Sequence, residues 1–499
     1  MSSSIIMLVV WVSIFTSLLI SMLVLLLVVG AILIPITVLL FLGMRQWIKQ
    51  RSMQLIPHLK TPNPDGSIPQ IVGFFHPYCN AGGGGERVLW CAINALQSKY
   101  KNIKCVVYTG DEDATGPEII QKARQRFNIV VKKPVEFIFL KRRNWVEATT
   151  WPYFTLLGQS LGSLMLGWEG LMQCVPDIYI DSMGYAFTLP MFKYLGGCKV
   201  GCYVHYPTIS TDMLSRVRER RQTYNNQDVV SQSSVLTSLK VLYYRIFAYV
   251  YGVVGARSDI VMVNSTWTHG HIQDLWSVKE KTSIVYPPCD TEDFLRLPLE
   301  DDSTKLNHTI VSVAQFRPEK DHRLQLLSFQ RLLRSTSETQ RDRLTLILVG
   351  SCRNQGDAAR VDELRQLCED LKIRSNVEFK LNVSFDELKK YLGEATIGLH
   401  TMWNEHFGIG VVECMAAGTV ILAHKSGGPK MDIVINYNDK PTGFLANDEE
   451  SYANAMETIL KMPAQQRMEM RKNARKSVVR FSEQEFNDNF LNSVQSLFN

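Results

Sequence analysis

The sequence contains no Cys-x-x-Cys pair, although it has ten cysteines in 499 residues. The closest two, Cys198 and Cys202, have no histidine cluster beside them, so we interpret them as buried structural thiols. Scattered single cysteines argue against a disulfide framework and are typical of a protein kept in a reducing compartment.

A strong charge imbalance is also missing. The chain has 54 Lys and Arg residues against 48 Asp and Glu residues, which leaves a formal net charge of +6. No basic run is interleaved with aromatic residues, so the sequence does not predict nucleic-acid binding. A mildly positive chain is compatible with an anionic substrate or a membrane surface. The length predicts two or three domains.

Formal charge is absent altogether from Ile5 to Gly43. A bilayer needs about 20 apolar residues in a helix, so this run predicts a transmembrane anchor over residues 1–44. Pro35 is expected to kink the helix or mark its edge. A cleaved signal peptide is the alternative, but the run has no basic segment before it and is too long.

Three basic residues, Arg45, Lys49 and Arg51, follow the apolar run, and no basic residue precedes it. The positive-inside rule therefore predicts that the long C-terminal portion is cytosolic. In that orientation no sequon meets the glycosylation machinery. The sequons are at Asn264, Asn307 and Asn382.

A linker over residues 45–69 leads to a first domain predicted over residues 70–290. Ile71–Phe75 reads as a buried strand, and four consecutive glycines, Gly82–Gly85, come between it and a helix. Glycine amides at a helix start suit a diphosphate. The loop matches neither a Walker A motif nor a clean G-x-G-x-x-G, so dinucleotide specificity is not supported. The alternative interpretation is that the four glycines only form a flexible turn.

Further strand-like runs alternate with helical stretches, which predicts a parallel, doubly wound sheet. The runs are Cys105–Tyr108, Val135–Phe139, Ile178–Ile180, Val200–Val204 and the segment after Asp259, which leads into a capped helix. Ligands bind at the carboxyl ends of such strands, so His205 is a candidate for contacting substrate or placing a proton, with a structural role equally open. We interpret Asp111–Asp113 as a solvated loop, since no third metal ligand is evident.

Residues Val235–Ala256 are rich in leucine, tyrosine, valine and phenylalanine, with Lys240 and Arg245 among them. Two cations make a membrane span unfavourable. The segment is predicted to be either a core helix or an interfacial helix lying on the membrane.

A Pro-rich passage, Val285–Asp290, marks the boundary to a second domain predicted over residues 291–465. This domain also alternates strands and helices, so two doubly wound domains would face each other across a cleft. Residues 466–499 are predicted to form a helix that packs back on the first domain. The strands expected here are Thr309–Ala314, Leu344–Gly350, Val377–Phe379, Ile397–His400 and the run from Val420.

Two cations, Arg317 and Lys320, follow the first of these strands and open a helix. Cations at a helix N-terminus oppose its dipole, so a bound anion would explain them better than a solvated helix start. Arg can hold a phosphate through its fork and Lys as a point charge.

Two carboxylates, Glu405 and Glu413, lie on either side of a helix start predicted near Gly410. Gly408 and Gly410 let the backbone come close to a ligand, and free amides at a helix start favour anions or hydroxyl-rich groups. Glu413 is placed to accept two hydrogen bonds from a ribose diol. The alternative is that both residues only complement the helix dipole. Together with the other motifs, the pattern predicts a nucleotide-sugar site.

These motifs together resemble glycosyltransferase family 4, whose members have the GT-B architecture of two Rossmann-like domains. The resemblance covers nearly all of the chain after about residue 70. It rests on the E-x7-E signature from Glu405 to Glu413, the glycine loop Ala81–Leu89, the segment Arg317–Lys320 and the passage Pro287–Asp290.

Within this family the chain is most similar to the members that add mannose to dolichol-linked oligosaccharides. The segments that carry this similarity are His76–Arg87, Val204–Thr208, Ala314–Lys320 and Asn404–Gly410. Bacterial relatives usually have Gly-Arg near the position of Gln315, whereas here the cation is displaced to Arg317.

The resemblance implies a retaining mannosyltransferase for protein N-glycosylation, anchored once in the endoplasmic reticulum membrane. GDP-mannose is the implied donor and a dolichol-pyrophosphate-linked trimannosyl oligosaccharide the acceptor. The fourth and fifth mannoses would be added in alpha-1,2 linkage on the cytosolic face. No cofactor or essential metal is implied, and other mannosyltransferases of the pathway are possible partners. The alternatives are another lipid-acceptor enzyme of different linkage or sugar, or a non-catalytic subunit that binds lipid-linked sugars.

The resemblance also implies residue roles. Glu413 would hold the GDP ribose, while Arg317 and Lys320 neutralise the leaving diphosphate with amides of Gly83 and Gly84. The mannose would be gripped by Glu405 with the N–H groups of Phe407, Gly408 and Ile409, and His205 would contact the sugar near the reacting carbon.

Overall fold

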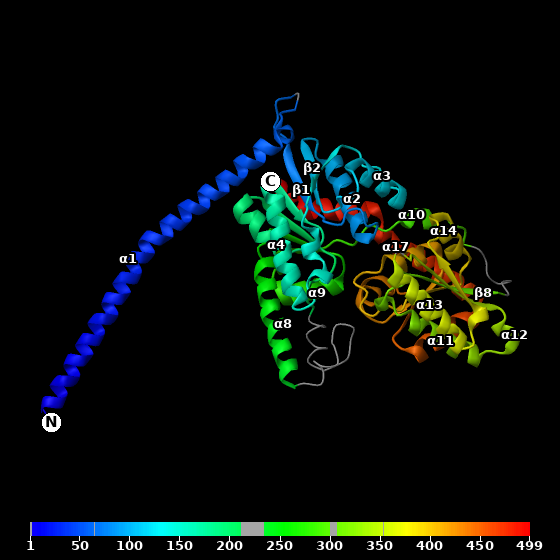
Figure 1. Cartoon of the computed structure of the whole chain (residues 1–499). Helices are drawn as coiled ribbons and strands as arrows, with labels where there is room; N and C mark the ends of the chain where they lie inside the picture. Colours follow the sequence, from blue (N-terminus) through cyan, green and yellow to red (C-terminus); the bar gives the residue numbers. More distant parts are fainter. Residues whose placement is uncertain (1, 64, 211–233, 300–306, 353) are drawn as a thin grey trace.

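Two α/β domains follow one long N-terminal helix in the computed structural model of this chain (Figure 1). The structure describes residues 2–63, 65–210, 234–299, 307–352 and 354–499. Each domain is built on one parallel sheet, so the predicted pair of doubly wound sheets is confirmed.

The first sheet has seven strands in the order β3-β2-β1-β4-β5-β6-β7, and all neighbours are parallel. Strand order reverses between β1 and β4, which opens a crevice at the carboxyl edge of the sheet. The strands are β1 (Gln70–Phe75), β2 (Ile103–Thr109), β3 (Val135–Phe139), β4 (Ile178–Asp181), β5 (Lys199–Val204), β6 (Ile260–Val263) and β7 (Thr282–Ile284).

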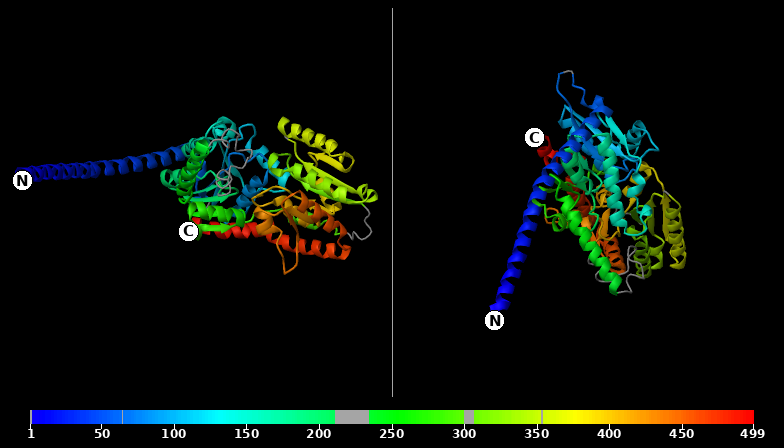
Figure 2. Two further views of the ribbon diagram at one scale, coloured as in Figure 1. Left: turned by 90° about the horizontal axis from the view of Figure 1, so that it is seen from below. Right: turned by 60° about the vertical axis from the view of Figure 1, so that its left-hand side comes forward.

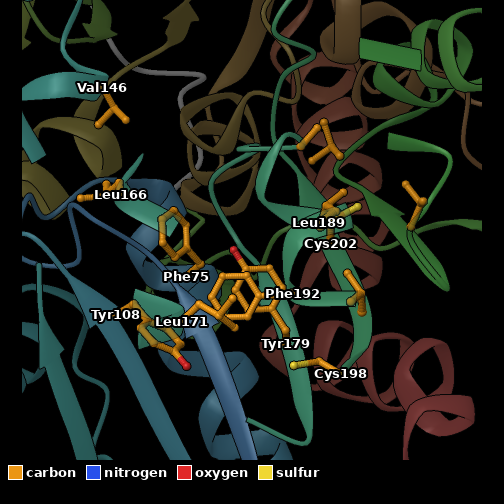
Figure 3. Close-up of a cluster of buried hydrophobic side chains, with 14 of the residues drawn as sticks. Phe75, Tyr108, Val146, Leu166, Leu171, Tyr179, Leu189, Phe192, Cys198 and Cys202 are labelled. Carbon is orange, nitrogen blue, oxygen red and sulfur yellow. The ribbon is translucent and has the colours of Figure 1, made fainter. Parts of the chain in front are cut away.

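Helices cover both faces of this sheet, because its strands are apolar on both sides. Phe75 contributes to a core on one face with Tyr108, Tyr179 and Phe192 (Figure 3), and the rings of Tyr179 and Phe192 stack with centroids 3.7 Å apart. The helices are α2 (Gly84–Lys99), α3 (Gly116–Phe127), α4 (Thr155–Gln173), α5 (Thr188–Met191), α8 (Ser234–Gly255) and α9 (Thr266–Trp276).

Of two local predictions for the first domain, the capped helix is confirmed and the solvated loop is corrected. The capped helix after β6 is confirmed, since Ser265 accepts a hydrogen bond from the Thr268 N–H at 3.1 Å. The loop at Asp111–Asp113 is only partly solvated. Asp111 is buried and paired with Arg143, because an otherwise unpaired buried carboxylate would be costly.

The second sheet has six parallel strands in the order β10-β9-β8-β11-β12-β13. Its strands are β8 (His308–Val313), β9 (Leu344–Gly350), β10 (Val377–Leu381), β11 (Ile397–Leu399), β12 (Val420–His424) and β13 (Gly443–Ala446). Its helices are α10 (Thr291–Leu295), α11 (His322–Ser335), α12 (Glu338–Arg341), α13 (Gln355–Asp370), α14 (Phe385–Glu394), α15 (Ile409–Ala417), α16 (Glu449–Lys461) and α17 (Ala464–Val478).

The C-terminal region forms two helices where the sequence predicted one. Helix α17 packs on α15 of the second domain. After a short turn, α18 (Glu483–Phe498) crosses to the first domain and lies along it (Figure 2). Four of its side chains, Phe486, Phe490, Val494 and Leu497, complete the core on the other face of the first sheet.

The N-terminal helix α1 (Ser2–Leu55) projects away from the domains (Figure 1). Among the described side chains, Ala31–Leu55 is long and apolar enough to cross a membrane, and Ser13–Leu25 is a shorter apolar stretch. Pro35 lies inside the helix and does not mark its edge. Proline has no N–H to donate and its ring crowds the carbonyl one turn earlier, yet the helix continues on either side of it.

Helix α1 also continues beyond residue 44, the predicted end of the anchor. Its last turns belong to the first domain, where Ile48 is fully buried and Ser52 accepts a hydrogen bond from the Val175 N–H at 2.8 Å. Arg45 lies against Gly197, which has a φ of +67° and leaves no room for a Cβ. The apolar part of α1 is therefore joined to the first domain by a continuous helix.

We expect Phe490→Ala to destabilise the first domain, although Phe490 follows the second domain in the sequence. Removing a buried phenylalanine costs about 3–5 kcal/mol. Hydrogen exchange of the full chain in detergent should accelerate in α2 and β5 and change little in β9 and α11. Gln495→Ala, at an exposed position of the same helix, is the matched control. Equal acceleration in both domains would contradict this assignment.

Candidate active site

The E-x7-E motif lies at the carboxyl edge of the second sheet. Glu405 is in the turn after β11 and Glu413 in the second turn of α15. The turn is supported from behind by Gly427 and Gly428, where an added Cβ would come within 2.3 Å of the carbonyl oxygens of Glu405 and Phe407. The Gly428 N–H also donates to the Glu405 carbonyl at 2.8 Å. Only glycine fits this contact, so the loop after β12 fixes the turn.

The carboxylate of Glu405 is bound by two side chains from different strands. Nζ of Lys320 lies 2.5 Å from its Oε2, and Nε2 of His400 lies 3.2 Å from the same atom. Lys320 ends the turn η6 (Pro318–Lys320) after β8, and His400 directly follows β11. His400 was not among the predicted site residues, although it directly follows a strand just as His205 does.

Burial alone would raise the pKa of Glu405, since only 15% of its side chain is exposed. Lys320 and His400 outweigh this effect and hold the pKa well below its ordinary value. Glu405 is therefore a carboxylate at neutral pH and can accept hydrogen bonds from sugar hydroxyls.

Arg317 differs from Lys320 in its exposure to solvent. Its side chain is exposed, and Arg317 directly precedes the η6 turn that ends at Lys320. The predicted joint contact of Arg317 and Lys320 with one anion is thus not visible as a preformed pair. Of the two cations, Lys320 is the one that contacts Glu405.

The glycine loop of the first domain meets the start of α15. A Cβ at Gly84 would lie 2.8 Å from Cδ1 of Ile409. Helix α15 begins at Ile409, and the N–H groups of Val411 and Val412 donate to the Gly408 carbonyl at 3.0 and 3.3 Å. The N–H groups of Ile409 and Gly410 precede these first hydrogen bonds of the helix. Gly408, with a φ of +114°, makes the preceding bend. Amides of the two domains are therefore brought to one place.

Gly83 differs from the expectation, because its amide has a partner within its own helix start. The N–H of Gly83 donates to Oε2 of Glu86 at 2.7 Å. Glu86 thus satisfies a donor that the sequence analysis assigned to a diphosphate. A bound diphosphate would have to compete with Glu86 for this amide.

His205 lies beside the glycine loop, with Nε2 3.5 Å from where a Cβ of Gly85 would be. Its Nε2 pairs with the Ser182 carbonyl at 3.1 Å, so Nε2 is the donor and Nδ1 the acceptor. The Ser182 hydroxyl pairs with Nδ1 of the buried His76 at 2.8 Å. Burial lowers the pKa of His205 to about 4, so this residue is neutral at physiological pH.

Glu413 faces charged groups of the first domain and of the interdomain passage. Its pKa is raised to about 7, chiefly by burial, while Arg87 opposes the shift and Asp290 adds to it. Nη1 of Arg87 lies 3.7 Å from Oδ2 of Asp290. Sequence reasoning missed Arg87, which is next to the glycine loop but 326 positions from Glu413.

Direct contacts join the domains beside this site. The ring of His406 stacks on Tyr206 with centroids 4.1 Å apart and lies 5.4 Å from Trp267. At the start of α9, Thr266 donates its hydroxyl to Asp432 at 2.5 Å and its amide at 3.1 Å. A carboxylate at a helix N-terminus is favoured by the dipole. These contacts hold the Glu405 turn against the first domain.

The described residues contain no group of three or more His, Cys, Asp or Glu side chains placed to hold a metal ion. Cation and amide groups instead gather where the two carboxyl edges meet. Such an arrangement can bind an anion with attached hydroxyl groups and stabilise negative charge as it develops.

Comparison with known proteins gives two family models that together cover most of the chain. Residues 69–276 match the model described as ALG11 mannosyltransferase N-terminus, and residues 301–477 match Glycosyl transferases group 1. The protein named GDP-Man:Man(3)GlcNAc(2)-PP-Dol alpha-1,2-mannosyltransferase is 58% identical in Xenopus tropicalis over 463 residues, which are 93% of this chain and 94% of that protein. The human protein of that name is 56% identical over 471 residues, 94% of each chain.

Solved structures support the fold. The crystal structure of Anabaena Alr3699/HepE in complex with UDP and glucose aligns with a TM-score of 0.57 at 16% identity and covers 86% of this chain and all of that chain. The OtsA apo structure aligns with a TM-score of 0.62 at 12% identity, covering 86% of this chain and 99% of that chain. The predicted GT-B architecture is confirmed.

The pKa of Glu413 predicts how donor binding depends on pH. Below about pH 7 this carboxyl group carries a proton in the free protein, and a ribose diol needs the carboxylate as acceptor. Binding must then release the proton, so affinity for GDP-mannose should fall by up to about tenfold per pH unit below 7 and level off above it. The doubly esterified diphosphate of GDP-mannose does not titrate in this range. Calorimetry between pH 5.5 and 8.5 measures this, and Glu413→Gln should bind more weakly but with a flat profile. An equal slope in both proteins would contradict the assignment.

Proposed function

This chain belongs to the family of GDP-Man:Man(3)GlcNAc(2)-PP-Dol alpha-1,2-mannosyltransferases, and we propose that it transfers mannose from GDP-mannose to the dolichol-pyrophosphate-linked trimannosyl oligosaccharide. It is a hexosyltransferase of the GT-B fold. The observation that most directly supports donor binding is the contact of Gly84 with Ile409, which brings the glycine loop to the amides at the start of α15.

Charge stabilisation of the leaving GDP is the main catalytic task in this proposal. Lys320 supplies the cation, and the amides of Gly84 and of the first turn of α15 supply hydrogen bonds. Arg317, which is exposed, would turn toward the diphosphate only when it is bound. Such preorganised groups need no metal, and we propose that no essential metal takes part.

The remaining site residues orient the donor. Glu405, with the N–H groups of Phe407, Gly408 and Ile409, binds the mannose hydroxyls, and Glu413 binds the ribose diol. His205 contacts the sugar near the reacting carbon through its neutral ring. We propose retention of the anomeric configuration and addition of the fourth and fifth mannoses in alpha-1,2 linkage.

Membrane attachment at the cytosolic face of the endoplasmic reticulum is the proposed setting, with α1 as a single anchor and other mannosyltransferases of the pathway as partners. Of the three sequons, Asn264 is buried and donates to the His205 carbonyl, so it could not carry a glycan in either orientation. Asn307 and Asn382 therefore report on topology.

Helix α8 has features of both alternatives that the sequence left open, a core helix and an interfacial helix. One face packs into the core through Phe247 and Tyr251, which are 4% and 0% exposed. The opposite face exposes six large apolar side chains at helical spacing, namely Leu239, Leu242, Ile246, Tyr249, Val250 and Val253. Phe154, which is exposed at the start of α4, continues this surface by packing edge-on against Tyr243. We propose that this surface lies on the bilayer that holds α1.

Lys320→Ala should reduce transfer by about 100-fold or more without unfolding the protein, because it removes a cation from the leaving diphosphate. Full-length protein would be incubated with GDP-mannose and a synthetic lipid-pyrophosphate trimannosyl acceptor. Mass analysis of the wild-type product should show two added hexoses that an alpha-1,2-specific mannosidase removes. Glu319→Gln, an exposed neighbour, is the control. Intact GDP binding without transfer by the wild type would favour a non-catalytic subunit, and full activity of Lys320→Ala would refute its role.

The α8 surface predicts contact with lipid. A bimane label at Ile246→Cys, in full-length protein reconstituted in liposomes, should be quenched by brominated phospholipid and shielded from iodide. Nine of the ten native cysteines are buried, so Cys352→Ser leaves a suitable background. A label at Val130→Cys, which is 57% exposed elsewhere on the first domain, is the matched control. Equal quenching at both positions would refute the proposed orientation.

A further inference from the structure

Among the described residues, the partners of the Glu405 carboxylate approach only one of its two oxygens. Lys320 and His400 both approach Oε2, at 2.5 and 3.2 Å. Neither partner occupies Oε1. The carboxylate is therefore oriented by one oxygen while the other can accept a hydrogen bond from a ligand.

The two partners differ in how firmly they are held. His400 is anchored at both backbone groups, since its N–H donates to the Leu422 carbonyl at 2.9 Å and its own carbonyl accepts from the Tyr452 hydroxyl at 2.8 Å. Its side chain is 10% exposed. Lys320 ends a short turn, is 22% exposed and reaches Glu405 through four flexible methylenes.

Proton placement on His400 follows from its surroundings. Nε2 must be the protonated nitrogen to donate to a carboxylate, and Nδ1 is buried with no hydrogen-bond partner among the described residues. An unpaired acceptor lone pair is tolerated better than an unpaired buried N–H, so this tautomer is the favoured one. His400 therefore donates to Glu405 through Nε2.

Donor binding places conflicting demands on Lys320. The proposed function, on which this inference rests, needs its ammonium group at the diphosphate. A Lys320 that turns to the diphosphate withdraws its charge from Glu405, and a carboxylate at 15% exposure cannot be left without a partner. His400 cannot follow Lys320, because its backbone is held at both groups.

We propose that His400 is the positioning residue of the donor-sugar site. It keeps its hydrogen bond to Oε2 of Glu405 when Lys320 moves to the diphosphate, and so aims Oε1 at the hydroxyls of the donor hexose. Lys320 and His400 hold Glu405 together in the free enzyme, and His400 holds it alone in the donor complex.

Paired amide substitutions test this role. The amide nitrogen of glutamine reaches about as far as Nε2 of histidine, whereas that of asparagine reaches only about as far as Nδ1. His400→Gln should keep transfer within a few-fold of wild type. His400→Asn should lower kcat by about 10- to 100-fold, the usual worth of a hydrogen bond to a charged group. The Kd for GDP, whose diphosphate draws Lys320 away from Glu405, should rise in His400→Asn and stay near the wild-type value in His400→Gln.

A double-substitution cycle shows whether His400 acts through Glu405. The loss of kcat in His400→Asn combined with Glu405→Gln should be no greater than in Glu405→Gln alone. Additive losses, or equal activity of the Gln and Asn variants, would overturn the proposal. Unchanged GDP binding in His400→Asn would also overturn it, because Lys320 could then move to the diphosphate without His400 holding Glu405. Failure of the wild type to transfer mannose would instead refute the proposed function.

Discussion

The carboxylate of Glu405 is kept charged in a place that water hardly reaches, and much of the site is arranged around this requirement. Burial would drive Glu405 to take up a proton, and Lys320 and His400 prevent it. These partners come from the ends of β8 and β11, so the ion pair joins two neighbouring strand ends at one atom. Gly427 and Gly428 then support the turn from behind. The groups that bind a sugar are thereby positioned before the sugar arrives, which is the condition for effective electrostatic catalysis.

The second constraint is that half of the site belongs to the other domain. Contacts at three places keep the domains in register: Gly84 against Ile409, the start of α9 against Asp432, and α18 across the first sheet. Helix α18 is the last helix of the chain, and its side chains complete the core of the first domain. The end of the chain therefore ties the second domain back to the first. The glycine loop and α15 are thus held opposite each other by packing remote from the chemistry, as positioned catalytic groups require.

The membrane imposes a third constraint, because a lipid-linked acceptor cannot leave the bilayer. The end of α1 is built into the first domain through Ile48 and Ser52, which limits how this domain can turn relative to its anchor. The exposed apolar face of α8 belongs to the same domain. Under the proposal that this face lies on the bilayer, two attachments would fix an orientation that one anchor would leave free, with the first domain at the lipid surface.

The sequence was enough to predict the two doubly wound domains, most of their strands, the E-x7-E turn and the family, because apolar runs, glycine loops and fixed spacings are local patterns. It missed β7 and β13, which have three and four residues and little alternation. The folded chain was needed to show that His400 shares Glu405 with Lys320, that Glu413 faces Arg87, that Glu86 engages the amide of Gly83, and which face of α8 is exposed. Such pairings depend on strand order and domain packing, which bring together residues up to hundreds of positions apart, and no local pattern encodes them.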